Sequence, residues 1–321
     1  MIRTTPFHER LTELNDQQLF THWSGYLSAL RFSHAPKHEY FAVRNAVGVF
    51  DTSPLFKYQV TGPDALDFLS GVVVRDLSVL RPGRAAYTLW CDDRGFVMED
   101  GVVFRQSENE LVMTAARPML SWLTSHLHRG RVVVEDVSDE YAMLAVQGPR
   151  SRDVLAGLVP EVMDLPYFGL AEAKLAKVPV TVSRTGYTGD LGFELTVPAD
   201  DAVAVLDAVL EAGRPHGLRP FGEEALMTLR IDDAEPGSPE TMWSMTESGS
   251  SSPSRTRWSA LVTASLTRGR PRRSVASSRR GSASTRSVRG VRRRGSGSDC
   301  GMGPILSHPA LTLSPEAYLV W

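Results

Sequence analysis

Short runs of alternating hydrophobic and polar residues fill the chain from about residue 40 to residue 230, and turn-forming residues separate them. Three runs with the two-residue period of a strand follow one another closely, at residues 85–91, 96–104 and 110–114. Polar tetrapeptides, at residues 92–95 and 106–109, join them as tight connections. The pattern therefore predicts three antiparallel strands in a meander.

Similar patterns predict further strands at residues 55–61, 131–135, 141–146, 178–183 and 192–197. Helices are predicted at residues 65–69, 117–127, 202–212 and 223–230, and another helix opens at Pro149. These elements do not alternate strictly, as they would in a doubly wound parallel sheet. We therefore predict an α+β fold with mostly antiparallel sheets and packed helices.

After Asp232 the periodic pattern ends. Residues 248–300 contain 13 arginines, 15 serines, no lysine and one acidic residue. Such a segment buries too little apolar area to offset chain entropy, so we expect it to be largely disordered. The sequence thus divides into an ordered region at 1–232, an Arg- and Ser-rich tail at 233–300 and an unassigned segment at 301–321, which is too short to fold alone.

The net charge of −2 hides two parts of opposite sign. Residues 1–247 hold 22 Lys and Arg against 35 Asp and Glu, a net charge of −13, whereas residues 248–321 hold 13 Arg against two acidic residues, a net charge of +11. The basic part is able to neutralise phosphates of RNA or DNA. Because it has almost no aromatic residues for base stacking, we expect any nucleic-acid binding to be non-specific.

Several classes of protein are disfavoured by composition. No apolar stretch approaches the roughly 20 residues of a membrane span, and the N-terminus lacks the basic-then-apolar pattern of a signal peptide. The two cysteines are too few for a disulfide framework and lack the spacing of a zinc site. We expect a cytoplasmic protein with no membrane partner and no metal.

Four local motifs stand in order along the chain. They are Ala-Val-Arg-Asn-Ala-Val-Gly-Val-Phe-Asp-Thr-Ser at 42–53, Tyr-Thr at 87–88 with Gly-Phe-Val-Met-Glu-Asp at 95–100, Ala-Val-Gln-Gly-Pro at 145–149 and Arg-Thr-Gly-Tyr-Thr-Gly-Asp-Leu-Gly-Phe-Glu at 184–194. The ordered set resembles the T-protein of the glycine cleavage system, an aminomethyltransferase, and its folate-dependent relatives, over about residues 5–232. The resemblance implies transfer of an aminomethyl or methyl group to tetrahydrofolate, from a small-molecule donor or an aminomethyl-lipoyl carrier protein.

The last motif carries the first site candidates. Its three glycines within seven residues predict a tight turn, either a plain hairpin or a place where the backbone closely approaches another group. Glu194 follows on an apolar strand, where an unpaired buried carboxylate is costly, so it either faces solvent or enters a cavity. The resemblance implies that Glu194 hydrogen-bonds the aminopyrimidine ring of the folate, and it makes Tyr187, Tyr87 and Arg230 further cofactor-binding candidates.

Glu99 and Asp100 are the candidate catalytic acids. As neighbours on a strand they point to opposite faces, so only one of them enters the site. Counting without gaps from Tyr87, the catalytic aspartate of the family falls on Glu99, and Asp100 matches its second acidic residue. The plain alternatives are an exposed acidic pair beside a hairpin and, for Tyr87, a packing aromatic on the sheet.

The sequence departs from the family pattern at further positions. Pro54 stands where the family has a histidine, and Leu226-Met227 stands where it has an Arg-Asp pair whose arginine binds substrate. These substitutions keep open a second activity, that of a folate-dependent demethylase.

The tail leaves a third possible interpretation of the function. The family continues beyond the position of Arg230 into a β-barrel that helps to close the folate cavity, and nothing after Asp233 resembles it. We expect an out-of-frame tail, and the product would then be an inactive one whose basic tail binds nucleic acid non-specifically.

Overall fold

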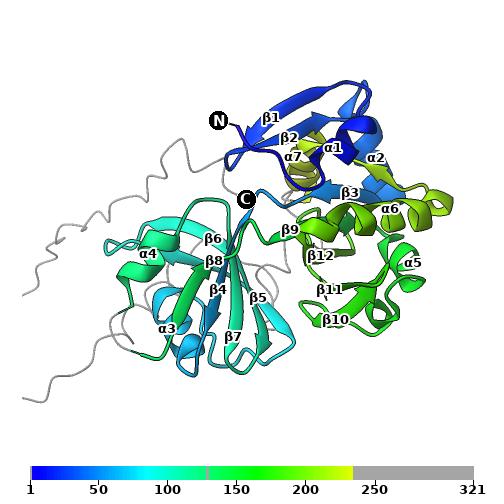
Figure 1. Ribbon diagram of the computed structural model, residues 1–321. Helices are drawn as coiled ribbons and strands as arrows, with labels where there is room; N and C mark the ends of the chain where they lie inside the picture. Colours follow the sequence, from blue (N-terminus) through cyan, green and yellow to red (C-terminus); the bar gives the residue numbers. More distant parts are fainter. Residues whose placement is uncertain (1, 128–129, 234–321) are drawn as a thin grey trace, which may run out of the picture.

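Two large sheets organise the part of the chain that the computed structural model describes, residues 2–127 and 130–233 (Figure 1). The first sheet has five antiparallel strands in the order β5-β6-β7-β4-β8. Their bounds are Arg84–Cys91 (β5), Val97–Ser107 (β6), Glu110–Ala115 (β7), Phe56–Thr61 (β4) and Val133–Asp136 (β8). The meander predicted from residues 85–114 is confirmed as β5-β6-β7.

Helices α3 (Ala65–Val72) and α4 (Leu120–Ser125) pack on one face of this sheet. The core between them contains Tyr58, Leu69 and Trp90, each fully buried. Helix α4 is shorter than the predicted 117–127, because it begins only after Pro118, whose ring disfavours the helical conformation in the residue before it.

The second sheet has six strands in the order β10-β11-β12-β9-β3-β13. Their bounds are Leu170–Leu175 (β10), Val178–Ser183 (β11), Gly192–Pro198 (β12), Tyr141–Gln147 (β9), Gly48–Asp51 (β3) and Arg219–Pro220 (β13). Among the described strands only β13 runs parallel to its neighbour. Helices α5 (Ser151–Ala156) and α6 (Ala202–Gly213), with short 3₁₀ turns at Pro160–Met163, Ala199–Asp201 and Arg214–His216, complete this half, and the predicted α+β fold is confirmed.

The outer face of the second sheet carries the larger core. Alternate residues of β9 and β12, such as Leu144 and Phe193, meet Leu206 of α6 and Val154 of α5 there. Alternation leaves Ala145, Glu194 and their neighbours on the opposite face, which is turned toward the first sheet. Both large sheets therefore bury one face in a core of their own and present the other face to each other.

The N-terminal elements were not predicted. They are α1 (His8–Glu13), the hairpin β1 (Leu19–Trp23) and β2 (Tyr26–Arg31), and α2 (Pro36–Asn45), and they lie beside the C-terminal α7 (Glu223–Asp233). A third, smaller core joins α2, β3 and α7 through Val43, Phe50 and Leu229. Residues near the start and the end of the described chain thus meet in one unit (Figure 1).

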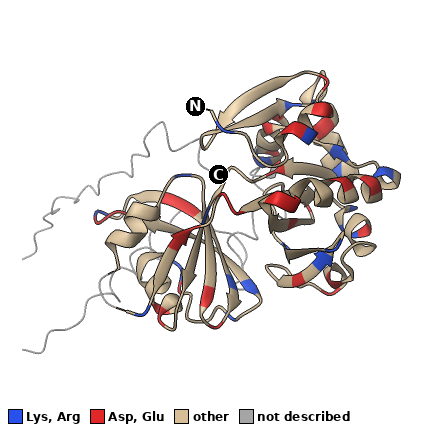
Figure 2. Ribbon diagram, in the orientation of Figure 1, with Lys and Arg blue, Asp and Glu red and all other residues tan. Residues whose placement is uncertain are grey.

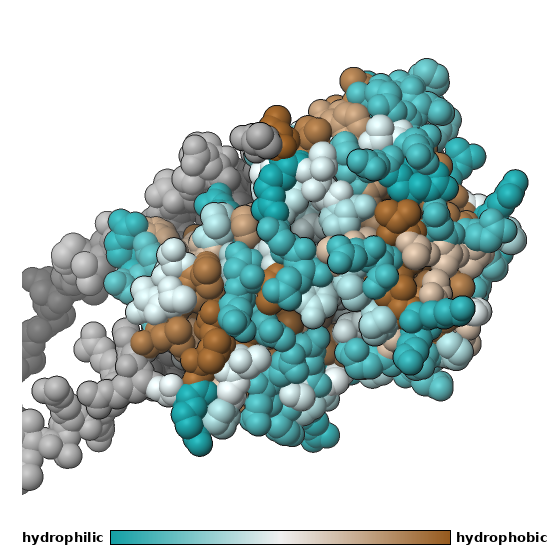
Figure 3. Space-filling model, viewed as in Figure 1, coloured by the Kyte–Doolittle hydropathy of each residue, from teal (hydrophilic) through white to brown (hydrophobic). Residues whose placement is uncertain are grey.

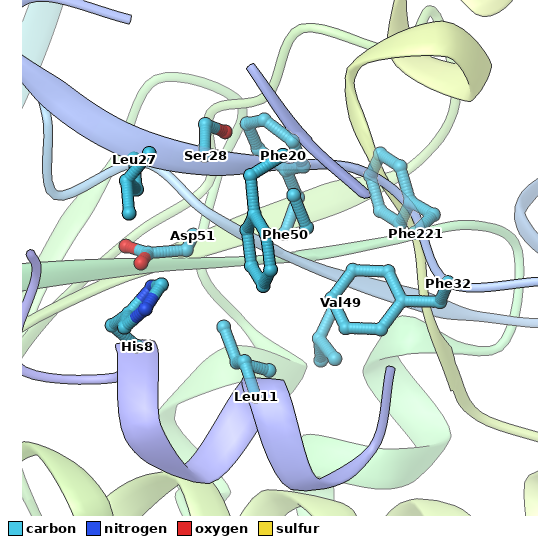
Figure 4. A pocket seen from close by; sticks show the side chains of 11 residues that line it. His8, Leu11, Phe20, Leu27, Ser28, Phe32, Val49, Phe50, Asp51 and Phe221 are labelled. Carbon is cyan, nitrogen blue, oxygen red and sulfur yellow. The ribbon is translucent and has the colours of Figure 1, made fainter. Parts of the chain in front are cut away.

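A small cavity of about 20 Å³ lies under α1 between aromatic and aliphatic side chains (Figure 4). Asp51 lines it, but its carboxylate accepts hydrogen bonds from the Thr5 hydroxyl at 2.5 Å and from the Ser53 amide at 2.9 Å. Burial raises the pKa of the Asp51 carboxyl, and these bonds oppose the shift. Asp51 therefore fixes the backbone of the Asp-Thr-Ser segment through the Ser53 amide, and it connects the N-terminal segment to β3 through the Thr5 hydroxyl.

The surface mixes charge and apolar area. Acidic and basic residues are both spread over the two halves of the described chain (Figure 2). On the face shown in Figure 3, apolar side chains form separate groups, one of them over the half that carries α4. In the described part of the chain, no helix is both long and apolar enough to span a bilayer. Asp233, where the predicted tail at 233–300 begins, is the last residue of α7, and the rest of that tail and the unassigned segment at 301–321 lie outside the described residues.

Candidate functional site

The glycine-rich turn at 184–192 folds around one buried side chain, Gln147. The Gln147 amide donates to the carbonyls of Thr185 at 3.3 Å and Phe193 at 3.2 Å, and its Oε1 accepts from the Thr188 hydroxyl at 3.0 Å. A Cβ at Gly186 or at Gly192 would overlap this amide. The close backbone approach predicted for the turn is confirmed, and two of the four motifs, Ala-Val-Gln-Gly-Pro and the glycine-rich turn, form one unit.

Gly186→Ala is expected to destabilise the fold by about 1–3 kcal/mol, because the added methyl group must displace a packed amide. Gly157→Ala is the matched control, since a Cβ there meets nothing within 4 Å and its φ of −79° suits alanine. Urea unfolding of both variants measures the difference. Equal stabilities would contradict the role given to Gln147.

Glu194 follows this turn on β12 and is buried, with 6% of its surface exposed. The Thr185 hydroxyl donates to Glu194 Oε2, and the Ser183 hydroxyl lies 2.6 Å from that of Thr185. Burial raises the pKa of the Glu194 carboxyl, while the bond from Thr185 acts in the opposite direction. Of the two possibilities left open for Glu194, the buried one is observed, on the face that looks toward the first sheet.

Asp100 lies on β6, at the facing sheet, and is paired with a tyrosine. The Tyr87 hydroxyl, from the neighbouring strand β5, donates to Asp100 Oδ2 at 2.5 Å. Burial raises the pKa of both groups, and the Asp100 carboxylate raises that of the Tyr87 hydroxyl further. The pair is thus a buried acid whose orientation is fixed by a phenol.

Glu99 points to the other face of β6, which it shares with Val103 of the first core. Its Oε1 accepts from the Asp100 backbone amide at 3.0 Å, and its Oε2 lies 3.7 Å from Arg117 Nε. Burial raises the pKa of Glu99 to about 7. The register of β5 and β6 shifts just before this point, since Trp90 faces Glu99 whereas Cys91 faces Val97. From Tyr87–Val102 to Trp90–Glu99 the pairing is unbroken, so the alternation that places Glu99 on the side of Val103 is not disturbed.

Arg230 and Tyr187 complete the group of predicted residues. The Arg230 guanidinium lies 3.9 Å from the centre of the Tyr187 ring, a cation–π contact between α7 and the glycine-rich turn. The charge of Arg230 also lowers the pKa values of Tyr87 and Asp100, against the larger effect of burial on each. Four of the six predicted site residues, Tyr87, Asp100, Tyr187 and Arg230, are therefore brought together.

A cavity of about 250 Å³ separates the two large sheets. The first sheet contributes Lys57, Phe104 and Thr114, and the second contributes Met143, Ser183 and Thr196, among others. Ser183 bonds to Thr185, the partner of Glu194, so the cavity reaches the hydrogen-bonded group around that carboxylate. Lys57 is buried, and its amine donates to the carbonyls of Ser53 at 2.9 Å and Leu55 at 2.8 Å; burial lowers its pKa to about 8.

Leu226 and Met227, the departure from the family pattern on α7, have different surroundings. Leu226 is buried in the small core with Phe50, and Tyr187 packs against that core. Met227 is 44% exposed. The leucine at this position therefore contributes an apolar side chain to the small core.

Several residues of the site were missed by sequence reasoning. Gln147 and Thr185 lay inside quoted motifs, but nothing in the pattern showed that one supports the turn and the other binds Glu194. Lys57 was seen only as part of a strand. A lysine in an apolar run was the available signal, because buried lysines need partners.

Known proteins resemble a large part of this chain. The family model described as the GCVT N-terminal domain matches residues 7–238. An aminomethyltransferase of Shouchella clausii is 43% identical over 202 residues, which is 61% of this chain and 55% of the relative. An aminomethyltransferase of Saccharopolyspora erythraea is 36% identical over 239 residues, 73% of this chain and 64% of the relative.

The fold agrees with these sequence matches. The crystal structure of glycine cleavage system aminomethyltransferase T from Bartonella henselae superposes with a TM-score of 0.67 at 22% identity, over 84% of this chain and 76% of that one. The chain spans 55% and 64% of the length of the two curated relatives above. It belongs to the glycine cleavage T-protein (aminomethyltransferase) family, through its GCVT N-terminal domain.

Proposed function

We propose that this chain carries the tetrahydrofolate-binding, catalytic part of an aminomethyltransferase. The observation that supports the proposal best is the buried Tyr87–Asp100 pair, with Arg230 near it and Glu194 on the facing sheet. The relatives named aminomethyltransferase give the reaction class. We further propose a lipoyl carrier protein as the donor of the aminomethyl group.

The residues fit a reduced pterin. Its aminopyrimidine edge offers neighbouring N–H donors, which suit a carboxylate such as Glu194. Aromatic rings at Tyr87 and Tyr187 suit a flat ring system. When bound, tetrahydrofolate supplies the nitrogen that accepts the one-carbon unit.

The side chains of the protein orient the ligand and place a charged group near the reacting atoms. We propose Asp100 as the acid at the reacting centre, because it shares its surroundings with Tyr87 and Arg230, whereas Glu99 lies on the core side of β6. A buried carboxylate stabilises positive charge that develops at a nearby nitrogen, and the Tyr87 hydroxyl keeps it in one orientation. Glu99 then acts through the backbone of Asp100, whose amide it binds.

Glu194→Gln tests the binding part of the proposal. The variant keeps the shape of the side chain and its bond from Thr185, but it loses the charge that favours the pterin donors. Tetrahydrofolate affinity should fall by roughly 1–3 kcal/mol, the usual range for a charge-assisted hydrogen bond. Titration calorimetry on the full chain measures this, with the exposed Glu211→Gln on α6 as control. Unchanged affinity would remove Glu194 from the site.

A further inference from the structure

Arg44, in the last turn of α2, connects two segments that are far apart in the sequence. Its Nη1 donates to the Thr188 carbonyl at 2.6 Å and to Asp190 Oδ2 at 2.5 Å. Its Nη2 donates to the Leu229 carbonyl at 3.0 Å, and its Nε donates to Asp232 Oδ2 at 3.0 Å. One guanidinium group thus bonds to both the glycine-rich turn and α7.

The two carbonyls that Arg44 holds adjoin two site residues. Thr188 directly follows Tyr187, and Leu229 directly precedes Arg230. The Tyr187 ring and the Arg230 guanidinium are in contact at 3.9 Å. Arg44 therefore bridges the glycine-rich turn and α7, and the contact between Tyr187 and Arg230 depends on the distance between these two segments.

We infer that Arg44 is a positioning residue that sets the geometry of the Tyr187–Arg230 contact and, through it, the affinity of the site for its ligand. Arg44 is mostly buried, with 17% of its side chain exposed, and its hydrogen-bond partners are Thr188, Asp190, Leu229 and Asp232 rather than Asp100 or Glu194. The part that concerns affinity rests on the proposed folate binding. The part that concerns geometry does not.

Arginine is required here for a geometric reason. A planar guanidinium directs its N–H groups along fixed axes to several acceptors, whereas a lysine ammonium is a compact point charge. Arg44→Lys keeps the charge beside Asp190 and Asp232 but loses simultaneous contact with both carbonyls. Its effect therefore separates positioning from net charge.

The affinity is tested by a double-mutant cycle on tetrahydrofolate binding, measured by calorimetry with the full chain. Arg44→Lys should weaken binding on the order of tenfold, as expected for a group that acts through a neighbour. In an Arg230→Met background, where the contact is already absent, the same change should have little effect. Arg10→Lys is the control, since Arg10 also pairs with two carboxylates, Glu13 and Asp207, on the surface. Equal losses in both backgrounds would overturn the inference.

The geometry is tested without any ligand. In protein labelled with 3-fluorotyrosine, Arg44→Lys should shift the ¹⁹F resonances of Tyr187 and of Tyr40, which contacts Arg44, and leave that of the distant Tyr58 unchanged. Asp190→Asn, a milder change at the turn, should shift the ¹⁹F resonance of Tyr187 in the same direction. This variant replaces Arg44→Lys in the test if Arg44→Lys does not fold. An unshifted Tyr187, or equal shifts at all three tyrosines, would refute positioning. Failure of the unmutated chain to bind tetrahydrofolate would instead count against the proposed function alone.

Discussion

Asp100→Asn should lower the rate of one-carbon transfer by at least about a hundredfold, the usual effect of removing a positioned charge or acid from a reacting centre. Asparagine has the size of aspartate and can still accept the hydrogen bond from Tyr87, so the fold should persist. The substitution removes the ionisable carboxyl group, and with it both the negative charge and the proton that this buried group can hold. Transfer of the aminomethyl group from a lipoyl carrier protein to tetrahydrofolate, followed in a single turnover, measures the loss.

Glu99→Gln is the matched comparison, because it makes the same chemical change one residue away. Its side chain lies on the core side of β6 and its Oε1 binds a backbone amide, so turnover should fall several-fold at most. This ranking reverses the one that counting from Tyr87 suggests, in which Glu99 takes the place of the catalytic aspartate. A larger loss in Glu99→Gln than in Asp100→Asn would restore Glu99 as the acid.

Glu223→Gln should stabilise the protein at pH 8 by about 3 kcal/mol. Glu223 lies in the first turn of α7, partly buried, and accepts a hydrogen bond from the Ser28 hydroxyl at 2.9 Å. Burial, together with the charge of Asp51, raises its pKa to about 7 from 4.5. A group with a raised folded-state pKa stabilises the fold fully below its unfolded value, and this contribution is lost as the pH rises from 4.5 through 7.

The expected stabilisation of about 3 kcal/mol follows from the raised pKa of Glu223, since each pKa unit corresponds to about 1.4 kcal/mol. Glutamine keeps the bond to Ser28 without the buried charge, so the gain should vanish at pH 4, where the glutamate is protonated. Urea unfolding at pH 4 and pH 8 measures both values, and the exposed Glu211→Gln should show no such difference between them. A gain that is the same at both pH values would show that Glu223 is not the titrating group.

The regular parts of the fold were accessible from the sequence. Strands at Glu110–Ala115, Val178–Ser183 and Gly192–Pro198 fall within one residue of the predicted ranges, because each alternates between a core face and a polar face. The hairpin Leu19–Arg31 was missed. Its β1 strand is exposed or half-buried throughout, so no apolar period marks it.

The site was predictable in its residues more than in its arrangement. The motifs contained Asp100, Tyr187 and Glu194, but alternation along a strand told only that Glu99 and Asp100 take opposite faces, and not which of the two faces the second sheet. The contacts of Arg44 join residues more than 140 positions apart. Long-range pairing of that kind depends on tertiary packing and leaves no local period.

The two main cores and the cavity between the sheets are built from largely different residues. The cavity is lined largely by polar side chains and by apolar ones outside those cores, and Val180 is shared with the core behind the second sheet. A substitution at Gln59, Thr114 or Thr196 would therefore change the lining of the cavity without removing a side chain from either main core. The shape and polarity of this cavity can therefore change while the packing of the two main cores stays the same.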